Sequence, residues 1–183
     1  MKRALSFFLP LCLLFIKSHS QTTISPVSAE GVYFTAIFFS VPEYSSGITD
    51  GNEHRSGSAG YIHQSPTPAG TTVMNKKVSV PFNLYNPNDS TLPVNVRVFV
   101  DWNGDNDFDD KDELVYDFDY NIYGHTSFGT SACWKNSMTP ISSVNVRFAV
   151  RQGGEKADAY GGYTGEIEDY KLDLISDVGL VVR

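Results

Sequence analysis

The sequence is poor in cysteine and in positive charge. Its 183 residues include two cysteines, and we expect one of them, Cys12, to be removed with an N-terminal signal. The other, Cys133, cannot form an internal disulfide alone, so the fold must draw its stability from its core, from a metal ion or from both. The 14 Lys and Arg residues are outnumbered by 21 Asp and Glu residues, which gives a formal net charge of −7. Such a surface argues against nucleic acid as a partner, because phosphates require a basic face.

Long hydrophobic runs are absent apart from one at the N-terminus. Residues 4–16 are almost all apolar and follow the basic start Met1-Lys2-Arg3, and Ser18-His19-Ser20 places small residues just before Gln21. This is the layout of a secretory signal peptide over residues 1–20, cleaved near Gln21. The alternative, a membrane anchor, requires a longer apolar run. We therefore expect a secreted, extracellular or cell-surface protein with no membrane span in the mature chain.

What the sequence does contain is period-two alternation of apolar and polar residues, the pattern of half-buried strands. No segment shows a sustained helical period. Turn-rich stretches separate the runs, which predicts an all-β fold: an antiparallel β-sandwich with a jelly-roll or immunoglobulin-like two-sheet architecture, in a single domain. Because proline cannot donate a ladder hydrogen bond, we expect the strand of Pro81 to lie at a sheet edge or to carry a bulge there. The expected strands cover residues 32–39, 78–84, 94–100, 144–150 and 170–174.

The most specific feature is an acidic stretch, residues 101–113, that directly follows the strand expected at 94–100. Oxygen-bearing side chains recur at every second position from 101 to 109, and acids stand again at 112 and 113. That spacing is typical of an EF-hand-like calcium loop, in which alternate positions wrap one cation and a later carboxylate closes the shell. Asn106 occupies the sharp-turn position that normally holds Gly, and Asn tolerates the left-handed conformation. Hard oxygen ligands select Ca²⁺ over metals that prefer softer ligands.

Charge repulsion within this acidic loop also favours a metal ion. Two like charges about 4 Å apart repel by roughly 1 kcal/mol in water and by about 4 kcal/mol at an effective dielectric of 20. The alternative is a solvated acidic turn whose carboxylates point apart. We expect Phe108 to point inward and anchor the loop, and Trp102 to cover its base. The predicted ligands are the side chains of Asp101, Asn103, Asp105 and Asp109, the backbone carbonyl of Asp107, and either Asp112 or Glu113 as the closing carboxylate, between which spacing does not decide.

A second acidic motif, Gly165-Glu166-Ile167-Glu168-Asp169-Tyr170, lies near the C-terminus. In the expected strand register, Glu166 and Glu168 share a face with Tyr170 and Leu172. Carboxylates on a core-directed face are costly unless they are paired or bound to a cation. We therefore expect both glutamates to lean toward the acidic loop as supporting acids.

The two motifs together resemble the GEVED domain, a module of secreted bacterial multidomain proteins. That family pairs a strand ending in an Asp-Trp-Asn-type acidic loop with a late Gly-Glu-Val-Glu-Asp-Tyr strand. Here they read Val98-Phe99-Val100-Asp101-Trp102-Asn103 and the motif at 165–170, with Ile167 in place of Val. Between them, Val146-Arg147-Phe148-Ala149-Val150-Arg151 resembles the penultimate strand of the family. The resemblance implies a non-catalytic extracellular β-sandwich, usually appended to peptidases, adhesins or other surface proteins.

Together with the signal-peptide pattern, this resemblance divides the chain into four segments. Residues 1–20 form the signal peptide, 21–71 the N-terminal strands and loops of the sandwich, 72–175 the GEVED-like region and 176–183 a C-terminal tail. We expect a calcium-stabilised, secreted or cell-surface module that acts in adhesion or protein interaction. Its partner would be an extracellular protein or a glycan.

Two other functions are alternatives to this interaction role: enzyme activity and carbohydrate binding. Glu166 and Glu168 have the separation of an inverting glycosidase pair, but such acids normally flank a cleft from different strands. The histidines form no His-Glu-x-x-His motif, so a zinc hydrolase is not expected, and we predict no enzyme activity. The alternative function is carbohydrate binding, in which sugar rings stack on aromatic side chains in or near loops. The candidate aromatics are Tyr120, Tyr123, Trp134, Tyr160 and Tyr163.

Overall fold

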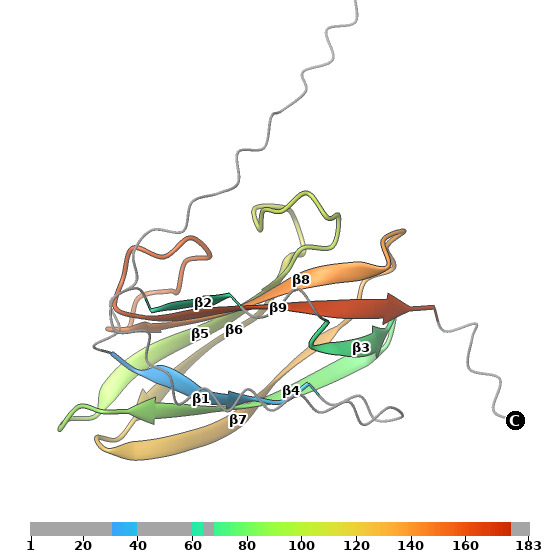
Figure 1. Cartoon of the computed structure of the whole chain (residues 1–183). Coiled ribbons are helices and arrows are strands. Elements are labelled where there is room, and N and C mark those ends of the chain that lie inside the picture. Colours follow the sequence, from blue (N-terminus) through green and yellow to red (C-terminus); the bar gives the residue numbers. More distant parts are fainter. Residues whose placement is uncertain (1–30, 40–59, 64–67, 177–183) are drawn as a thin grey trace, which may run out of the picture.

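The alternating segments form strands, and the computed structural model packs these strands into two sheets (Figure 1). The structure describes residues 31–39, 60–63 and 68–176. The predicted signal peptide lies outside these residues, and so does the predicted tail after residue 176. Within the described residues there is no helix, and thus none with the length and apolar character needed to cross a membrane.

The smaller sheet has three antiparallel strands in the order β1-β4-β7: β1 (Tyr33–Ile37), β4 (Lys77–Asn86) and β7 (Thr126–Lys135). Pro81 lies in β4, the central strand, so the prediction of an edge strand was wrong. Its carbonyl accepts a hydrogen bond from the Phe38 N–H at 2.8 Å, just beyond the end of β1. The missing N–H of proline therefore costs pairing only where β1 has already ended. The irregularity of this sheet lies instead in β1, between Phe34 and Ala36.

The larger sheet has six strands, with the order β2-β9-β8-β5-β6 and β3 also paired to β9. Its main strands are antiparallel, as predicted, but β2 and β3 run parallel to β9, which corrects the expectation of a purely antiparallel fold. The sequence patterns anticipated β5, β8 and β9 but not the other three. The strands are β2 (Tyr61–His63), β3 (Gly70–Val73), β5 (Leu92–Val100), β6 (Leu114–Ile122), β8 (Ser143–Gln152) and β9 (Gly165–Ile175).

The main core lies between the sheets and contains apolar residues from both of them. Phe34 of β1, Phe82 of β4 and Phe148 of β8 meet edge to face, with centroids 5.8–6.2 Å apart. Each is almost fully buried, and burying such a side chain contributes about 1.5–3 kcal/mol. The sheets are thus joined by interlocking aromatic rings in place of a disulfide.

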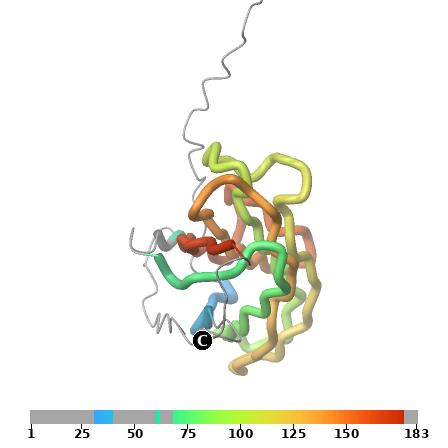
Figure 2. The backbone as a smooth tube through the Cα atoms, turned by 90° about the vertical axis from the view of Figure 1, so that its right-hand side faces the viewer, coloured from blue at the N-terminus to red at the C-terminus, as the bar shows by residue number. Residues whose placement is uncertain are grey.

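A second, smaller apolar cluster lies on the opposite face of the larger sheet. Because strand side chains alternate between faces, Phe99, Ala149 and Ile167 point away from the main core and pack with residues of the loop after β8. In Figure 1 the acidic loop after β5 and the loop after β8 both rise on this outer side. Figure 2 shows the acidic loop, in yellow-green, at the top of the molecule and away from β1 in blue. This outer face positions the candidate site.

The register of β9 begins at Gly165, whose φ of 150° is one that other residues rarely adopt. A Cβ atom at this position would lie 1.9 Å from the carbonyl oxygen of Val150. From this start, Glu166 pairs with Val150 and Asp169 pairs with Arg147 across the β8–β9 ladder.

Candidate metal centre

The base of the acidic loop is fixed by backbone hydrogen bonds at the end of β5. The Val100 N–H donates to the Glu113 carbonyl at 2.8 Å, and the Asp101 N–H donates to the Asn145 carbonyl at 3.0 Å. The Trp102 side chain is 9% exposed and belongs to the main core. Its indole N–H donates to the Asp112 carbonyl at 3.2 Å, so Trp102 closes the base of the loop as predicted.

The alternate oxygen-bearing residues fold the loop through a series of local turns. The side-chain oxygens of Asn103, Asp105 and Asp107 each accept a hydrogen bond from the backbone N–H two residues later, at 2.9, 3.3 and 3.1 Å. Such side-chain turns are the usual reason why Asn and Asp dominate tight loops. Asn106 has a φ of 68°, which confirms its predicted left-handed conformation. The period-two spacing therefore produces a compact, wound loop.

Three carboxylates converge within this loop. Asp101, Asp105 and Glu113 each offer an oxygen, and these oxygens all lie within 4.8 Å of one another. Asp101 and Glu113 are buried, at 0% and 1% exposure. This set has the hard oxygen donors that Ca²⁺ prefers.

The buried carboxylates are held by backbone donors that aim them into the loop. Asp101 accepts hydrogen bonds from the N–H groups of Gly104 (2.6 Å) and Asn106 (3.1 Å). Glu113 accepts from the N–H groups of Trp102 (3.1 Å) and Asp110 (3.3 Å). Burial nevertheless raises the pKa of Asp101 and raises that of Glu113 to about 7. The ionised carboxylates are therefore poorly stabilised in the absence of a cation, and a bound cation would relieve that cost.

A second group of carboxylates adjoins the first and shares Asp105 with it. Asp105, Asp107 and Asp110 also have oxygens within 4.8 Å of one another, and this group is nearer the surface. The sequence analysis did not include Asp110, because that residue falls outside the alternating pattern. Asp107 enters this group through its carboxylate, whereas its backbone carbonyl was the predicted ligand.

The remaining predicted ligands lie at the rim of the loop. Asn103, Asp109 and Asp112 are exposed, and the two acids among them belong to neither carboxylate group. Asp112 has a φ of 72° and uses its carbonyl to bind Trp102, while the next side chain, Glu113, turns inward. The geometry therefore favours Glu113 over Asp112 as the closing carboxylate, a choice that spacing left open.

Glu166 and Glu168 face the interior between the two sheets. Both are buried, and they share this face with Tyr170 and Leu172, as the register predicted. An oxygen of Glu166 accepts a hydrogen bond from the Phe34 N–H at 2.6 Å, and Glu168 accepts one from the Tyr170 hydroxyl. The expectation that they lean toward the acidic loop is corrected, because the loop packs on the opposite face of the sheet.

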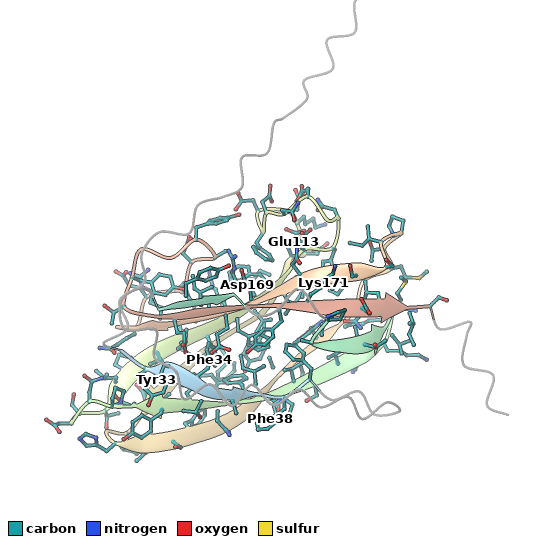
Figure 3. All side chains as sticks on the ribbon, in the orientation of Figure 1. Tyr33, Phe34, Phe38, Glu113, Asp169 and Lys171 are labelled. Carbon is teal, nitrogen blue, oxygen red and sulfur yellow. The ribbon has the colours of Figure 1, made fainter. Side chains whose placement is uncertain are left out.

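The acid of β9 that does reach the outer face is Asp169. Arg147 of β8 donates to both of its carboxylate oxygens at 2.6 Å, and the side chains of this pair are 8% and 13% exposed. The Arg147 guanidinium also lies over the ring of Phe108, 4.7 Å from its centroid, and Phe108 packs against Phe99. Figure 3 shows Glu113 and Asp169 on the side of the larger sheet away from Phe34. Phe108 is therefore the anchor predicted for the loop, and Arg147–Asp169 is its support.

Tyr160 connects the acidic loop to the loop after β8. Its hydroxyl oxygen accepts a hydrogen bond from the Phe108 N–H at 3.0 Å. Burial, together with the nearby carboxylates of Asp109 and Asp107, raises the pKa of Tyr160 to about 12. The Tyr160 hydroxyl therefore helps to fix the position of the acidic loop.

Most of the aromatic side chains predicted to stack on sugar rings are not exposed in loops. Trp134 belongs to β7 and Tyr120 to β6, so neither lies in a loop. Trp134 and Tyr163 are only 7% and 8% exposed. Of the candidate aromatics, Tyr123 is exposed, at 72%.

Comparisons with known proteins match part of the chain to one domain family. The sequence model of the GEVED domain matches residues 95–173, which confirms the family resemblance. No curated protein matches the chain. The chain is similar to the structure of a CARDB domain from Pyrococcus furiosus, solved in complex with di-metal ions, at 12% identity over 60% of this chain and 87% of that one, with a TM-score of 0.41. It is also similar to a Niemann-Pick type C2 protein from the Japanese carpenter ant, at 10% identity over 84% of this chain and 99% of that one, with a TM-score of 0.41.

Proposed function

We propose that this protein, whose residues 95–173 form a GEVED domain, is a non-catalytic, secreted or cell-surface module that Ca²⁺ stabilises and that acts in adhesion or protein interaction. The observation that carries the calcium proposal is the convergence of Asp101, Asp105 and Glu113 in one wound loop. The signal-peptide pattern of residues 1–20 supports export.

Calcium would be held by the buried group, with the adjoining group of Asp105, Asp107 and Asp110 adding oxygens at the surface. Ca²⁺ takes six to eight oxygen ligands in flexible geometry, and extracellular modules bind it with dissociation constants of about 10⁻⁴–10⁻³ M. At a tenfold excess over the dissociation constant, one bound ion stabilises the folded state by roughly 1.4 kcal/mol. That contribution suits a small exported sandwich that cannot form an internal disulfide.

The placement of the acids supports a non-catalytic role. The candidate glycosidase pair, Glu166 and Glu168, is at most 5% exposed and faces the main core. A polysaccharide chain cannot reach carboxylates in that position. His125 lies in an exposed turn, where its ring contacts Asp89 at 2.8 Å, and it has no place in the acidic loop.

Thermal unfolding with calcium and with chelator tests the calcium proposal. We expect a clear rise in melting temperature with Ca²⁺, and we expect the Asp101→Ala, Asp105→Ala double variant to abolish it. The matched control is Asp89→Ala, which removes a fully exposed carboxylate outside the loop and should keep the calcium response. Equal melting temperatures of the wild type in both conditions would return the loop to a solvated acidic turn.

The interaction role is separated from sugar binding by a glycan array, probed with and without calcium, alongside a pull-down from extracellular protein. A silent array and a recovered protein partner would support the proposed role. Specific glycan binding would favour the carbohydrate-binding alternative.

A further inference from the structure

A row of aromatic rings runs along β6, which lies at one edge of the larger sheet. The rings of Tyr116 and Phe118 have centroids 6.4 Å apart, and those of Phe118 and Tyr120 are 5.0 Å apart. Phe128 of β7 extends the row, 4.8 Å from Tyr120. Phe118, in the middle of the row, is 55% exposed, which is unusual for so large an apolar side chain flanked by two others. The rings follow the two-residue repeat of a strand, so a matching ligand should have the same repeat.

Among the described residues, the backbone of β6 is paired with a neighbouring strand on one side only. Along a strand, successive residues direct their N–H and C=O groups to opposite sides. In β5, the carbonyl of Pro93 bonds toward β8, to the Gly153 N–H, whereas the N–H of Val100 bonds toward β6. The backbone N–H and C=O groups of even-numbered residues in β5 therefore point toward β6, and among these residues Val96 pairs with Phe118. The N–H and C=O groups of Phe118 therefore point toward β5. The N–H and C=O groups of its odd-numbered neighbours in β6 point away from β5.

Within the described part of the chain, no strand pairs with this outer side of β6. The outward N–H and C=O groups belong to Asp117, Asp119 and Asn121, a stretch that has no proline and no bulge. Proline and bulges block strand addition at the edges of natural sheets, and so do charged side chains. In this stretch only the charges of Asp117 and Asp119 oppose it, and a partner strand of opposite charge would not be repelled by them. An extended peptide would use these backbone groups and the aromatic row together. A sugar stacked on the rings would leave the backbone groups unused.

The charges at this edge indicate which peptide fits. Asp117 and Asp119 lie on the face opposite the rings. Lys156 contacts both carboxylates at 2.9 Å, and Arg97 of β5 also pairs with Asp117 at 2.9 Å, so Asp119 is the carboxylate more open to a partner. The Asp119 side chain is 63% exposed. In an antiparallel pairing of two copies centred on Phe118, Asp117 of one copy would lie opposite Asp119 of the other, and like charges in that position repel. A partner strand with basic residues at those positions would instead pair with the carboxylates.

We propose that the outer edge of β6, which no strand of the described residues pairs with, binds an extended segment of a partner protein by strand addition, with alternate apolar and basic side chains on that segment. The apolar side chains would pack on the row of Tyr116, Phe118 and Tyr120, and the basic ones would lie beside Asp117 and Asp119. This inference deepens the proposed interaction role and rests on it, but it does not depend on calcium.

A short synthetic peptide of alternating lysine and valine residues tests the proposal on the full chain. We expect it to bind and to slow hydrogen exchange at the backbone amides of Asp117, Asp119 and Asn121. Phe118→Ala should weaken binding about tenfold by removing the central ring. Asn121→Pro should weaken it as well, because it removes an outward N–H that the ladder to β5 does not use. The matched control, Tyr123→Ala, removes an exposed aromatic outside the row and should leave binding unchanged.

Three results would overturn the proposal. The first is that the peptide does not slow hydrogen exchange at those three amides, whether or not it binds elsewhere. Another is a dimer in light scattering that Phe118→Ala dissociates, which would make a second copy the occupant. The third is that a soluble β-linked glucose oligosaccharide, and not the peptide, shifts the NMR signals of the aromatic rings in the row. The calcium-dependent rise in melting temperature should persist in Phe118→Ala, so a failure of the calcium proposal is seen separately from a failure of this one.

Discussion

Arg147 and Asp169 form a two-pronged ion pair beneath the acidic loop, with both nitrogen–oxygen distances at 2.6 Å. Arg147 comes from the strand with alternating arginines, and Asp169 comes from the second acidic motif. Phe108 of the acidic loop lies on the guanidinium. The three sequence features of the family resemblance therefore meet at one point, on the outer face of the larger sheet.

Loss of either partner should destabilise the fold strongly. Arg147→Ala leaves the Asp169 carboxylate without a counter-ion, and Asp169→Asn does the same to the buried Arg147 guanidinium; breaking such a pair costs about 3–5 kcal/mol. Urea unfolding measures the change in the free energy of unfolding. The matched control is Arg151→Ala, which breaks an ion pair with the exposed Glu155 and should cost less than about 1 kcal/mol. Similar losses in the Arg147 and Arg151 variants would contradict the structural role given to Arg147.

The closing carboxylate can be identified by a pair of conservative substitutions. Glu113→Gln should weaken calcium binding at least about tenfold, because losing even a residue that only supports a metal ligand lowers metal affinity about tenfold or more. Asp112→Asn should have little effect, because Asp112 uses its carbonyl, and Asn tolerates its φ of 72°. Isothermal titration calorimetry with Ca²⁺ measures both. The reverse order of effects would assign the closing role to Asp112.

The stability of the calcium-free protein should fall as the pH rises toward neutrality. Burial raises the pKa of Glu113 from its usual 4.5 to about 7, so the folded state favours the protonated form. The resulting stabilisation is fully present below pH 4.5 and is lost as the pH rises through about 7. In chelator, the melting temperature of the wild type should therefore decrease over this range relative to Glu113→Gln. Calcium should reduce the decrease, because it binds the ionised carboxylate. Parallel curves for the two proteins in chelator would show that Glu113 does not titrate in this way.

The hydroxyl of Tyr160 should contribute to the order of the acidic loop. Tyr160→Phe removes the acceptor of the Phe108 N–H, and a lost hydrogen bond of this kind costs about 1 kcal/mol. We expect a lower free energy of unfolding and a weaker affinity for calcium. Tyr123→Phe, at an exposed turn position, serves as the control and should change neither. Unchanged calcium binding in Tyr160→Phe would show that the Tyr160 hydroxyl does not contribute to the order of the calcium site.

The sequence predicted the parts of the fold that depend on local patterns. Alternating apolar residues marked β1, β4, β5, β8 and β9, and the alternating oxygens marked the loop. Strand β6 was missed because its acids, Asp117 and Asp119, continue the composition of the acidic loop. Strands β2 and β3 are short, and they form because β9 offers them an edge. A chain segment of three or four residues carries too little pattern to reveal such pairing.

The candidate site was predicted in part for the same reason. Asp101, Asp105 and Glu113 follow from spacing, but spacing could not choose between Asp112 and Glu113. Which partner a buried acid takes depends on contacts between distant strands. Glu166 binds the backbone of β1, and Asp169 binds Arg147, and neither contact leaves a signal in a single sequence.

Gly165 has a consequence for the whole motif that follows it. The Val150 carbonyl leaves no room for a side chain there, so this residue locks where β9 starts against β8. Odd and even positions downstream then have fixed destinations, with glutamates inside and the aspartate outside. Inserting or deleting one residue between Gly165 and Asp169 would reverse that parity, sending the aspartate into the apolar interior and leaving the arginine without its counter-ion. A position with no side chain thus sets which face of the sheet each acid of β9 occupies.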